Sequence, residues 1–350
     1  MKYIKILIIV AIIAVLLFFF LKNVDFKEVV RIIRSVDPIY PIIFLVGLYL
    51  QFFLRGYRWG LILRPHKKKI PLMTLYNYTV IGFLLNMLPG KMGEPARGIL
   101  LAKEENINRS YGLASVVLER MLDLFMLLMI FFAAVIFMPD TGSQIMLKLK
   151  RASFFAFPLV LLFFFLFYLI NTERMFGRVE RLIRFFARLA PEKIRERLVN
   201  FTLHFVKGLR LQMTPWEYVK LIVSSMLVWL YLIPFYWLLM QGFGFGKNVS
   251  LLETFPYFCV LVVSAAIPTP GMAGSFELAS RLGLEQLYGA DPNQATAYTL
   301  LAHFIILIIM VIPGLIAFWS KGFHMKTIKT MKEDNNEHKV ANETKADVQV

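Results

Sequence analysis

The chain of 350 residues contains a single cysteine, Cys259, which lies in an apolar stretch. One thiol excludes a disulfide framework and a cysteine-based metal site. The sequence also lacks the His-Glu-x-x-His motif of zinc peptidases, a glycine-rich nucleotide loop and a serine nucleophile elbow. Acidic residues are few, with 23 against 39 basic ones, which gives a net charge of +16. These absences exclude several common enzyme classes and direct attention to the apolar and basic residues.

Hydrophobic residues make up 58% of the chain, including 33 phenylalanines. A membrane-spanning helix requires about 20 apolar residues, and fewer where flanking Lys or Arg reach the interface. The sequence therefore predicts an all-α polytopic membrane protein. We expect the first stretch to be a helix and not a cleaved signal, because Lys22-Asn23-Val24-Asp25 follows it in place of small residues. The apolar stretches are Ile6–Leu21, Pro38–Leu54, Ile70–Gly90, Leu124–Met138, Ala152–Asn171, Leu221–Gly246, Thr254–Phe276 and Pro292–Ser320.

Basic residues are concentrated in three regions. Six lie between Arg55 and Lys69 without an acidic residue, and ten lie between Asn171 and Pro215 against four acidic ones. The tail after Ser320 is rich in lysine. Nucleic-acid binding is one meaning of such a balance, but these regions flank apolar stretches, as cytoplasmic loops do. We therefore expect a protein of the cell membrane with both termini in the cytoplasm and no nucleic-acid partner.

The basic regions also restrict the number of membrane crossings. All three face the cytoplasm only if residues 70–109 dip into the membrane and return, and residues 250–291 do the same from outside. This predicts six crossings and two re-entrant hairpins that enter from opposite faces, the pattern of an inverted repeat. Eight full crossings are the alternative, because Ile70–Gly90 is long enough to span. The predicted domains are a membrane domain at 1–320, with a basic cytoplasmic interfacial segment at 172–215, and a polar, disordered tail at 321–350.

Each predicted hairpin is interrupted by a Pro-Gly segment that leads to a glutamate. The first reads Pro89-Gly90-Lys-Met-Gly93-Glu94, and the second reads Pro270-Gly271-Met-Ala-Gly274-Ser-Phe-Glu277. A broken membrane helix frees backbone polar groups, which is tolerated where the backbone lies within protein or lines a watery cavity. Paired breaks in the two halves of a chain indicate the binding site of a transporter.

The motifs around these breaks resemble a known family. They are Arg55-Gly-Tyr-Arg58-Trp59, Pro89-Gly90-x-x-Gly93-Glu94-x-x-Arg97, Glu119-Arg120-x-x-Asp123 and Pro268-x-Pro270-Gly271-x-x-Gly274-x-x-Glu277. In this order they look like the membrane domain of lysylphosphatidylglycerol synthases, which also exists as standalone flippase-like proteins. The resemblance covers roughly residues 1–320 and implies movement of lipid between leaflets. The soluble synthase domain of the fused enzymes is not seen in the polar tail, so lysylphosphatidylglycerol is not implied as the substrate.

The charged residues after the first break have two interpretations. Glu94 and Arg97 share one helix face and provide a polar step for a lipid headgroup, Arg97 for its phosphate and Glu94 for an amine or a proton. Alternatively, they belong to an ordinary helix N-terminus at the interface. Glu119, Arg120 and Asp123 line the same path or form an internally paired cluster that locks two helices together.

The remaining candidate residues lie outside the first break. Glu277 is expected to mirror Glu94 or to pair with Arg281, and His303 to be a hydrogen-bonded interior residue. Arg55, Arg58 and Trp59 fit snorkelling and belt residues, with headgroup contact as the alternative. The predicted translocation residues, which are expected to line one cavity between the hairpins, are Glu94, Arg97, Glu119, Arg120, Asp123 and Glu277, with Pro89, Gly90, Gly93, Pro270, Gly271 and Gly274. Secondary candidates are Asn86, Arg55, Arg58 and Arg281.

Basic residues recur at helical spacing between Arg174 and Arg188, beside an apolar stripe that includes Leu182 and Phe186. This pattern predicts a helix in the plane of the interface, attracted to anionic lipid. A charged face of a soluble loop helix is the alternative.

The sequence favours a lipid flippase that needs no cofactor. Its expected partners are membrane lipids, anionic or polyprenyl-linked, a separately encoded lipid-modifying enzyme, and a second copy in a homo-oligomer. Two alternatives stay open. One is a membrane-embedded enzyme that acts on a lipid-linked substrate with carboxylates as acid or base. The other is a non-catalytic subunit of such an enzyme.

Overall fold

The computed structural model describes residues 2–88, 92–137, 172–187, 191–264, 267 and 269–322, with isolated residues between 151 and 165. Within these residues the chain is helical and contains no strand, as predicted for a polytopic membrane protein. The α-helices are α1 (Lys2–Leu21), α2 (Phe26–Ser35), α3 (Ile39–Leu63), α4 (Leu72–Leu85), α5 (Gly93–Glu104), α6 (Arg109–Phe137), α8 (Glu173–Ala187), α9 (Glu192–Gly208), α10 (Pro215–Leu230), α11 (Leu232–Gln241), α12 (Thr254–Ser264), α13 (Ser275–Tyr288) and α14 (Pro292–Ser320). Two 3₁₀ turns, η1 (Gly244–Asn248) and η2 (Pro270–Met272), complete them.

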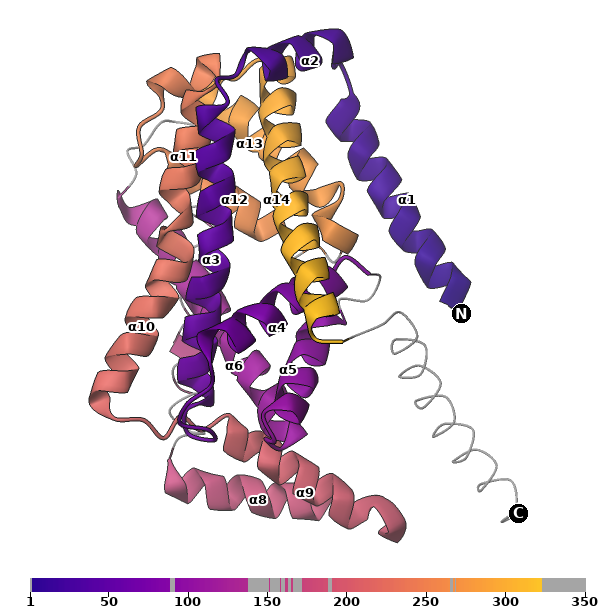
Figure 1. Cartoon of the computed structure of the whole chain (residues 1–350), viewed down its shortest axis with the longest axis vertical. Coiled ribbons are helices and arrows are strands. Elements are labelled where there is room, and N and C mark those ends of the chain that lie inside the picture. Colours follow the sequence, from indigo (N-terminus) through magenta and orange to yellow (C-terminus); the bar gives the residue numbers. More distant parts are fainter. Residues whose placement is uncertain are drawn as a thin grey trace.

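Long apolar helices run along the longest axis of the molecule (Figure 1). Among the described residues, α3, α14 and the continuous stretch Pro215–Gln241 are long and apolar enough to cross a membrane. That stretch comprises α10 and α11, which adjoin at Tyr231. Pro234 follows within the first turn of α11, where its ring removes a backbone donor and interrupts the hydrogen-bond ladder. These helices form the frame on which the shorter ones pack.

Two pairs of shorter helices lie toward opposite ends of this frame. The pair α4 and α5 lies beside the lower half of α3, and the pair α12 and α13 lies beside the upper half of α14 (Figure 1). Lys67 precedes the first pair and Glu105 follows it. Lys67 Nζ lies 2.6 Å from Glu105 Oε2. At the second pair, the Tyr288 hydroxyl donates to the Glu253 carbonyl at 2.6 Å. Each pair therefore begins and ends at the same end of the molecule.

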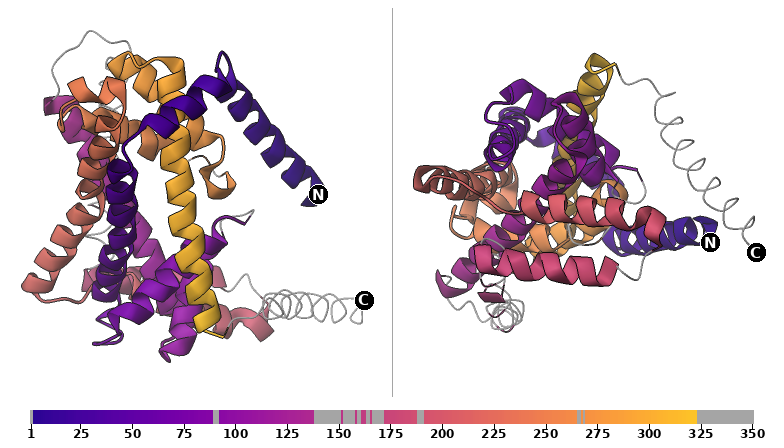
Figure 2. Two further views of the ribbon diagram at one scale, coloured as in Figure 1. Left: turned by 45° about the horizontal axis from the view of Figure 1, so that its top comes forward. Right: turned by 90° about the horizontal axis from the view of Figure 1, so that it is seen from below.

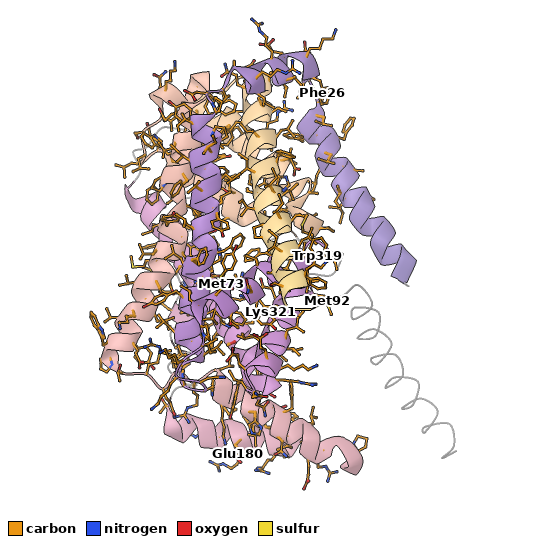
Figure 3. The ribbon with its side chains drawn as sticks, in the orientation of Figure 1. Phe26, Met73, Met92, Glu180, Trp319 and Lys321 are labelled. Atoms are coloured by element: carbon orange, nitrogen blue, oxygen red, sulfur yellow. The ribbon has the colours of Figure 1, made fainter. Side chains whose placement is uncertain are left out.

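The two ends of the molecule are covered by helices that lie across its long axis. Figures 1 and 2 show α2 across the upper end and α8 and α9 across the lower end. Phe26 of α2 and Glu180 of α8 mark these ends (Figure 3). Arg188, the last residue of the predicted basic stripe, lies outside the described residues. The rest of the stripe is carried by α8, as its helical spacing predicted.

Glycines allow α4, α5 and α6 to pack with their backbones nearly in contact. A Cβ atom on Gly93 would lie 1.9 Å from the Gly82 carbonyl oxygen. A Cβ atom on Gly112 would lie 2.2 Å from the Gly98 carbonyl oxygen. No side chain fits at such separations, so larger residues would push the three helices apart. This close approach brings polar side chains of three helices to one place.

Candidate functional site

Two arginines, Arg55 and Arg58, lie in the C-terminal half of α3. This helix does not end with the apolar run at Leu54 but continues to Leu63. Arg55 is 6% exposed, and Arg58 and Trp59 are fully buried. The expectation that these three residues snorkel to the interface is wrong, because α3 turns them toward α6, where they are buried. They belong instead to a buried polar cluster.

Glu119 of α6 is the centre of this cluster. It has no exposed surface and accepts from three guanidinium groups. Arg58 Nη2 donates to its Oε1 at 3.0 Å, and Arg97 Nη2 donates to its Oε2 at 2.8 Å. Arg120 Nη2 donates to Oε1 at 3.2 Å. One carboxylate therefore joins α3, α5 and α6.

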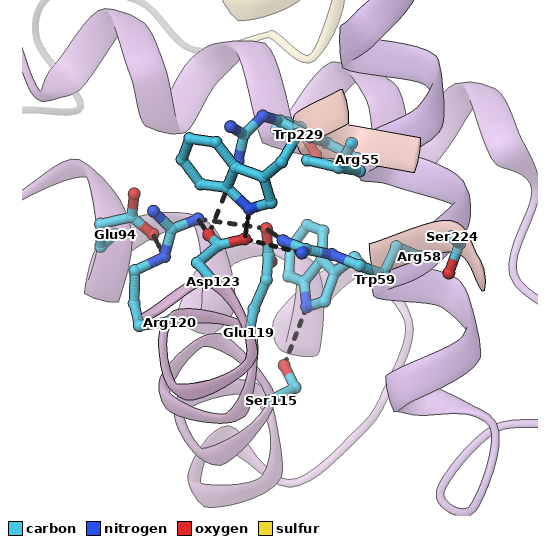
Figure 4. A network of polar contacts seen from close by, with 12 residues as sticks. Arg55, Arg58, Trp59, Glu94, Ser115, Glu119, Arg120, Asp123, Ser224 and Trp229 are labelled. Atoms are coloured by element: carbon cyan, nitrogen blue, oxygen red, sulfur yellow. Dashed lines mark hydrogen bonds and ion pairs between the residues drawn. The ribbon is translucent and has the colours of Figure 1, made fainter. Parts of the chain in front are cut away.

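Asp123, one turn along α6, forms a second junction (Figure 4). Its carboxylate lies 2.6 Å from Arg58 Nη1 and 2.9 Å from Arg120 Nη2. Trp229 of α10 donates its indole N–H to the same carboxylate at 3.0 Å. Arg55 Nη1 is more distant, at 3.7 Å. The pairing of Arg120 with Asp123 on one helix face agrees with the sequence prediction, and Trp229 adds a fourth helix.

Glu94 and Arg120 form the accessible edge of the cluster, next to the first break. Arg97 donates to Glu94 Oε2 from Nη2 at 2.9 Å, and Asn86 Nδ2 donates to Oε1 at 3.3 Å. The Glu94 side chain is 21% exposed and that of Arg120 is 39% exposed. Met92, which precedes them in the break, is exposed. Pro89 and Gly90 lie outside the described residues.

Aromatic rings enclose the buried guanidinium groups. Arg97 lies over the ring of Trp59 at 4.8 Å, and Arg55 lies over the ring of Trp229 at 5.2 Å. Trp59 is held in turn by a hydrogen bond to Ser115 Oγ at 2.9 Å. Rings in these positions favour a cation while they exclude water. They hold the arginine side chains in place.

The cluster contains more positive than negative groups. We call its four guanidinium groups and three carboxylates the arginine–carboxylate cluster. Arg55 Nε and Arg97 Nη1 are buried without a hydrogen-bond partner in the described part of the chain. A buried donor without a partner is costly, so the cluster is suited to receive an anion with several acceptor oxygens. Its members are Arg55, Arg58, Glu94, Arg97, Glu119, Arg120 and Asp123.

The second break has a different polar centre. Glu277 is 8% exposed and accepts from the Gly274 backbone N–H at 2.7 Å. His303 of α14 places Nδ1 2.8 Å from Glu277 Oε1 and Nε2 2.9 Å from the Gly271 carbonyl oxygen. Gly271 and Gly274 have φ values of 58° and 81°, which side chains disfavour. His303 is a hydrogen-bonded interior residue, as predicted, but its partner Glu277 was not foreseen.

Arg281 does not pair with Glu277, contrary to one of the two expectations. It binds Glu285 one turn further along α13, with 2.6 Å between Nε and Oε1. Its Nη1 also donates to the backbone carbonyls of Phe20 and Lys22 at the end of α1. The side chain therefore points along α13 toward α1, and Glu277 is left to His303.

The two breaks lie close together. Met87 Cε, just after α4, would be 3.7 Å from a Cβ atom on Gly271 in η2, which begins at Pro270. In the described residues, however, no hydrogen bond or ion pair joins Glu277 to the arginine–carboxylate cluster. The candidate residues thus form two polar centres, and the single cavity expected to contain them stays a prediction.

The family model for the lysylphosphatidylglycerol synthase TM region matches residues 6–314. The chain belongs to this family. The matched region contains both breaks and the arginine–carboxylate cluster, and it confirms the resemblance found in the sequence motifs.

Two archaeal relatives are similar over most of their length. A UPF0104 membrane protein of Methanocaldococcus jannaschii is 22% identical over 304 residues, which is 84% of this chain and 88% of the relative. A UPF0104 membrane protein of Methanothermobacter thermautotrophicus is 24% identical over 307 residues, 83% of this chain and 85% of the relative. No solved structure matches the chain significantly. Like these relatives, the chain is a membrane protein.

Proposed function

We propose that this protein moves a phospholipid, or another lipid with a phosphate-containing headgroup, between membrane leaflets. The observation that carries the proposal is the excess of guanidinium groups in the arginine–carboxylate cluster, next to a broken helix. Arg120 and Glu94 give this cluster an accessible edge of both charges. A phosphate supplies the missing negative charge and oxygens for the unpartnered donors.

Electrostatics explains why such a cluster assists lipid movement. A phosphate or amine crosses hydrocarbon slowly because the loss of its hydration is costly. Arginine is suited to replace that hydration, since its planar donors bind phosphate oxygens in pairs. In this proposal Arg120 and Arg97 receive the phosphate, and Glu94 receives an amine where the headgroup has one. The acyl chains remain in lipid throughout.

The arrangement of the helix pairs supports a route across the membrane. The contact of Lys67 with Glu105, and that of Tyr288 with Glu253, close the base of each pair at one end. We infer that 70–109 is a re-entrant hairpin on the cytoplasmic side and 250–291 one on the outer side. Because the breaks meet near Met87, a small displacement of either tip would change which side reaches the cluster.

The test is lipid movement by the purified protein in vesicles that contain a fluorescent phospholipid. Arg120→Gln gives the cluster equal numbers of positive and negative groups, so we expect it to fold and to lose most movement. Arg97→Gln and Glu94→Gln should also abolish movement. Arg64→Gln is the matched control, because Arg64 lies at the end of α3 in a partly exposed pair with Glu217.

Each outcome of this assay has a definite meaning. Wild-type rates in well-folded Arg120→Gln, Arg97→Gln and Glu94→Gln proteins would make the cluster purely structural and refute the mechanism. A chemically altered lipid would identify a membrane-embedded enzyme instead. If the wild-type protein neither moves lipid nor alters it chemically, the result would favour a subunit of a separate lipid-modifying enzyme.

A further inference from the structure

The geometry of Glu277 and His303 fixes the number of protons that they share. Both ring nitrogens of His303 face oxygen atoms, one from the Glu277 carboxylate and one from the Gly271 carbonyl. A carbonyl oxygen only accepts, so Nε2 must carry a proton. The contact of Nδ1 with Glu277 requires a second proton, on the ring or on the carboxyl group.

Loss of one proton breaks this arrangement. With a single proton on the ring, one nitrogen presents a lone pair to an oxygen at 2.8 Å or 2.9 Å. Two facing acceptors repel each other, and this repulsion is stronger in a buried position of low dielectric. Glu277 is 8% exposed and His303 is 4% exposed. The two contacts of His303, which hold the second break closed against α14, are therefore compatible with the protonated pair only.

Among the described residues, no other charged group contacts Glu277 or His303. On α13, Arg281 is bound to Glu285 and to carbonyls of α1. From α12, the Tyr257 hydroxyl contacts Ser280 at 2.7 Å, and Ser280 contacts Thr299 of α14 at 2.6 Å. The other neighbours of this break in the described part of the chain are uncharged. They are Ile13 and Leu16 of α1 at Gly274, Leu307 of α14 and Met87 at Gly271, and the ring of Phe276 against His303.

We propose that the Glu277–His303 pair is a proton-binding site whose protonated form holds the second break closed. Release of the proton frees the Gly271 carbonyl, and the turn at Gly271 then separates from α14. Because Met87 of the first break lies against Gly271, this opening is transmitted to the hairpin that carries Glu94 and Arg97. If the function proposed above holds, the proton is the ion that drives lipid movement.

One substitution reproduces the protonated pair without a proton to lose. In Glu277→Gln, the amide oxygen accepts from Gly274 N–H while the amide N–H donates to a neutral His303. Both hydrogen bonds of the break persist without a shared proton that could be released. Glu285→Gln is the matched control, because it removes a carboxylate from the same helix without affecting His303.

The experiment follows the accessibility of the break as the pH is changed. Ala273→Cys is introduced with Cys259→Ser, and the rate of thiol labelling is measured in the membrane-inserted protein. Relative to the Glu277→Gln background, labelling should rise about tenfold as the pair deprotonates, the factor expected for one lost hydrogen bond to a charged group. The comparison cancels the ionisation of the thiol itself. The Glu285→Gln background should retain the rise.

The outcomes separate this proposal from the proposed function. A labelling ratio that does not change with pH overturns the proton site, even where lipid moves. Loss of the rise in the Glu285→Gln background, which leaves the Glu277–His303 pair intact, overturns it as well. If labelling of the break depends on pH as expected but the protein moves no lipid at any pH, the result supports the proton site and refutes lipid transport. Lipid movement that is indifferent to the direction of an imposed pH gradient refutes proton coupling.

Discussion

Glu119→Gln is the substitution that tests most directly how the arginine–carboxylate cluster holds the fold together. Glu119 is fully buried and accepts from Arg58, Arg97 and Arg120 at 2.8–3.2 Å. Glutamine has nearly the same shape, but it carries no charge, and its amide N–H must face at least one guanidinium donor. Breaking a buried ion pair from one side costs about 3–5 kcal/mol, because the partner charge stays buried. We expect a loss of that size in the free energy of unfolding.

The measurement is equilibrium unfolding of the purified protein in mixed micelles, titrated with a denaturing detergent. Glu217→Gln is the control, since Glu217 pairs with Arg64 at 3.1 Å with both side chains partly exposed. A pair of this kind contributes about 0–1 kcal/mol, and glutamine can still form the capping box with Thr214. If Glu119→Gln destabilises the protein no more than Glu217→Gln does, the cluster is not a structural junction and our account of its burial is wrong.

Three further predictions concern the hairpins and the surface. Gly93→Ala should abolish stable folding in a thermal-unfolding assay, because its Cβ would lie 1.9 Å from the Gly82 carbonyl, whereas Gly177→Ala has open space and should be neutral. Single cysteines at Lys67 and Arg109 should be labelled from the same, cytoplasmic side of the membrane, and labelling from opposite sides would exclude a re-entrant 70–109 hairpin. Neutralising Arg178 and Arg181 of α8 should weaken retention of anionic lipid by about 1 kcal/mol each; unchanged retention would favour a helix that lies away from the membrane surface.

The sequence predicted those features of the fold that depend on local patterns. Apolar length located the long helices α3 and α14, and the Pro-Gly segments located the interruptions before α5 and α13. The pairing of Glu94 with Arg97 and of Arg120 with Asp123 followed from helical spacing alone. Such features require only residues a few positions apart, so one sequence is enough to find them.

The features that the sequence did not predict depend on contacts between distant segments. Arg55 and Arg58 follow an apolar run, a position equally suitable for snorkelling, and only the crossing of α3 with α6 shows that they meet Glu119 and Asp123. Likewise, Glu277 and His303 are 26 residues apart, and neither carries a local signal for the other. The sequence nevertheless contained two indications of these buried groups. One is a second arginine one turn from the first, and the other is the only histidine in the last apolar stretch.

The contact of Arg281 with α1 has a consequence for the order of assembly in the membrane. The C-terminal carbonyls of a helix have no partners within it, and at the end of α1 Arg281 satisfies those of Phe20 and Lys22 from 261 and 259 positions further along the chain. At a synthesis rate of about 5–20 residues per second, α1 is released into the membrane roughly 10–50 s before its partner exists. During that interval α1 must remain in lipid by its own hydrophobicity. Helix α1 is therefore fixed at this end only after most of the later helices exist, and a chain interrupted before Arg281 leaves these two carbonyls without that donor.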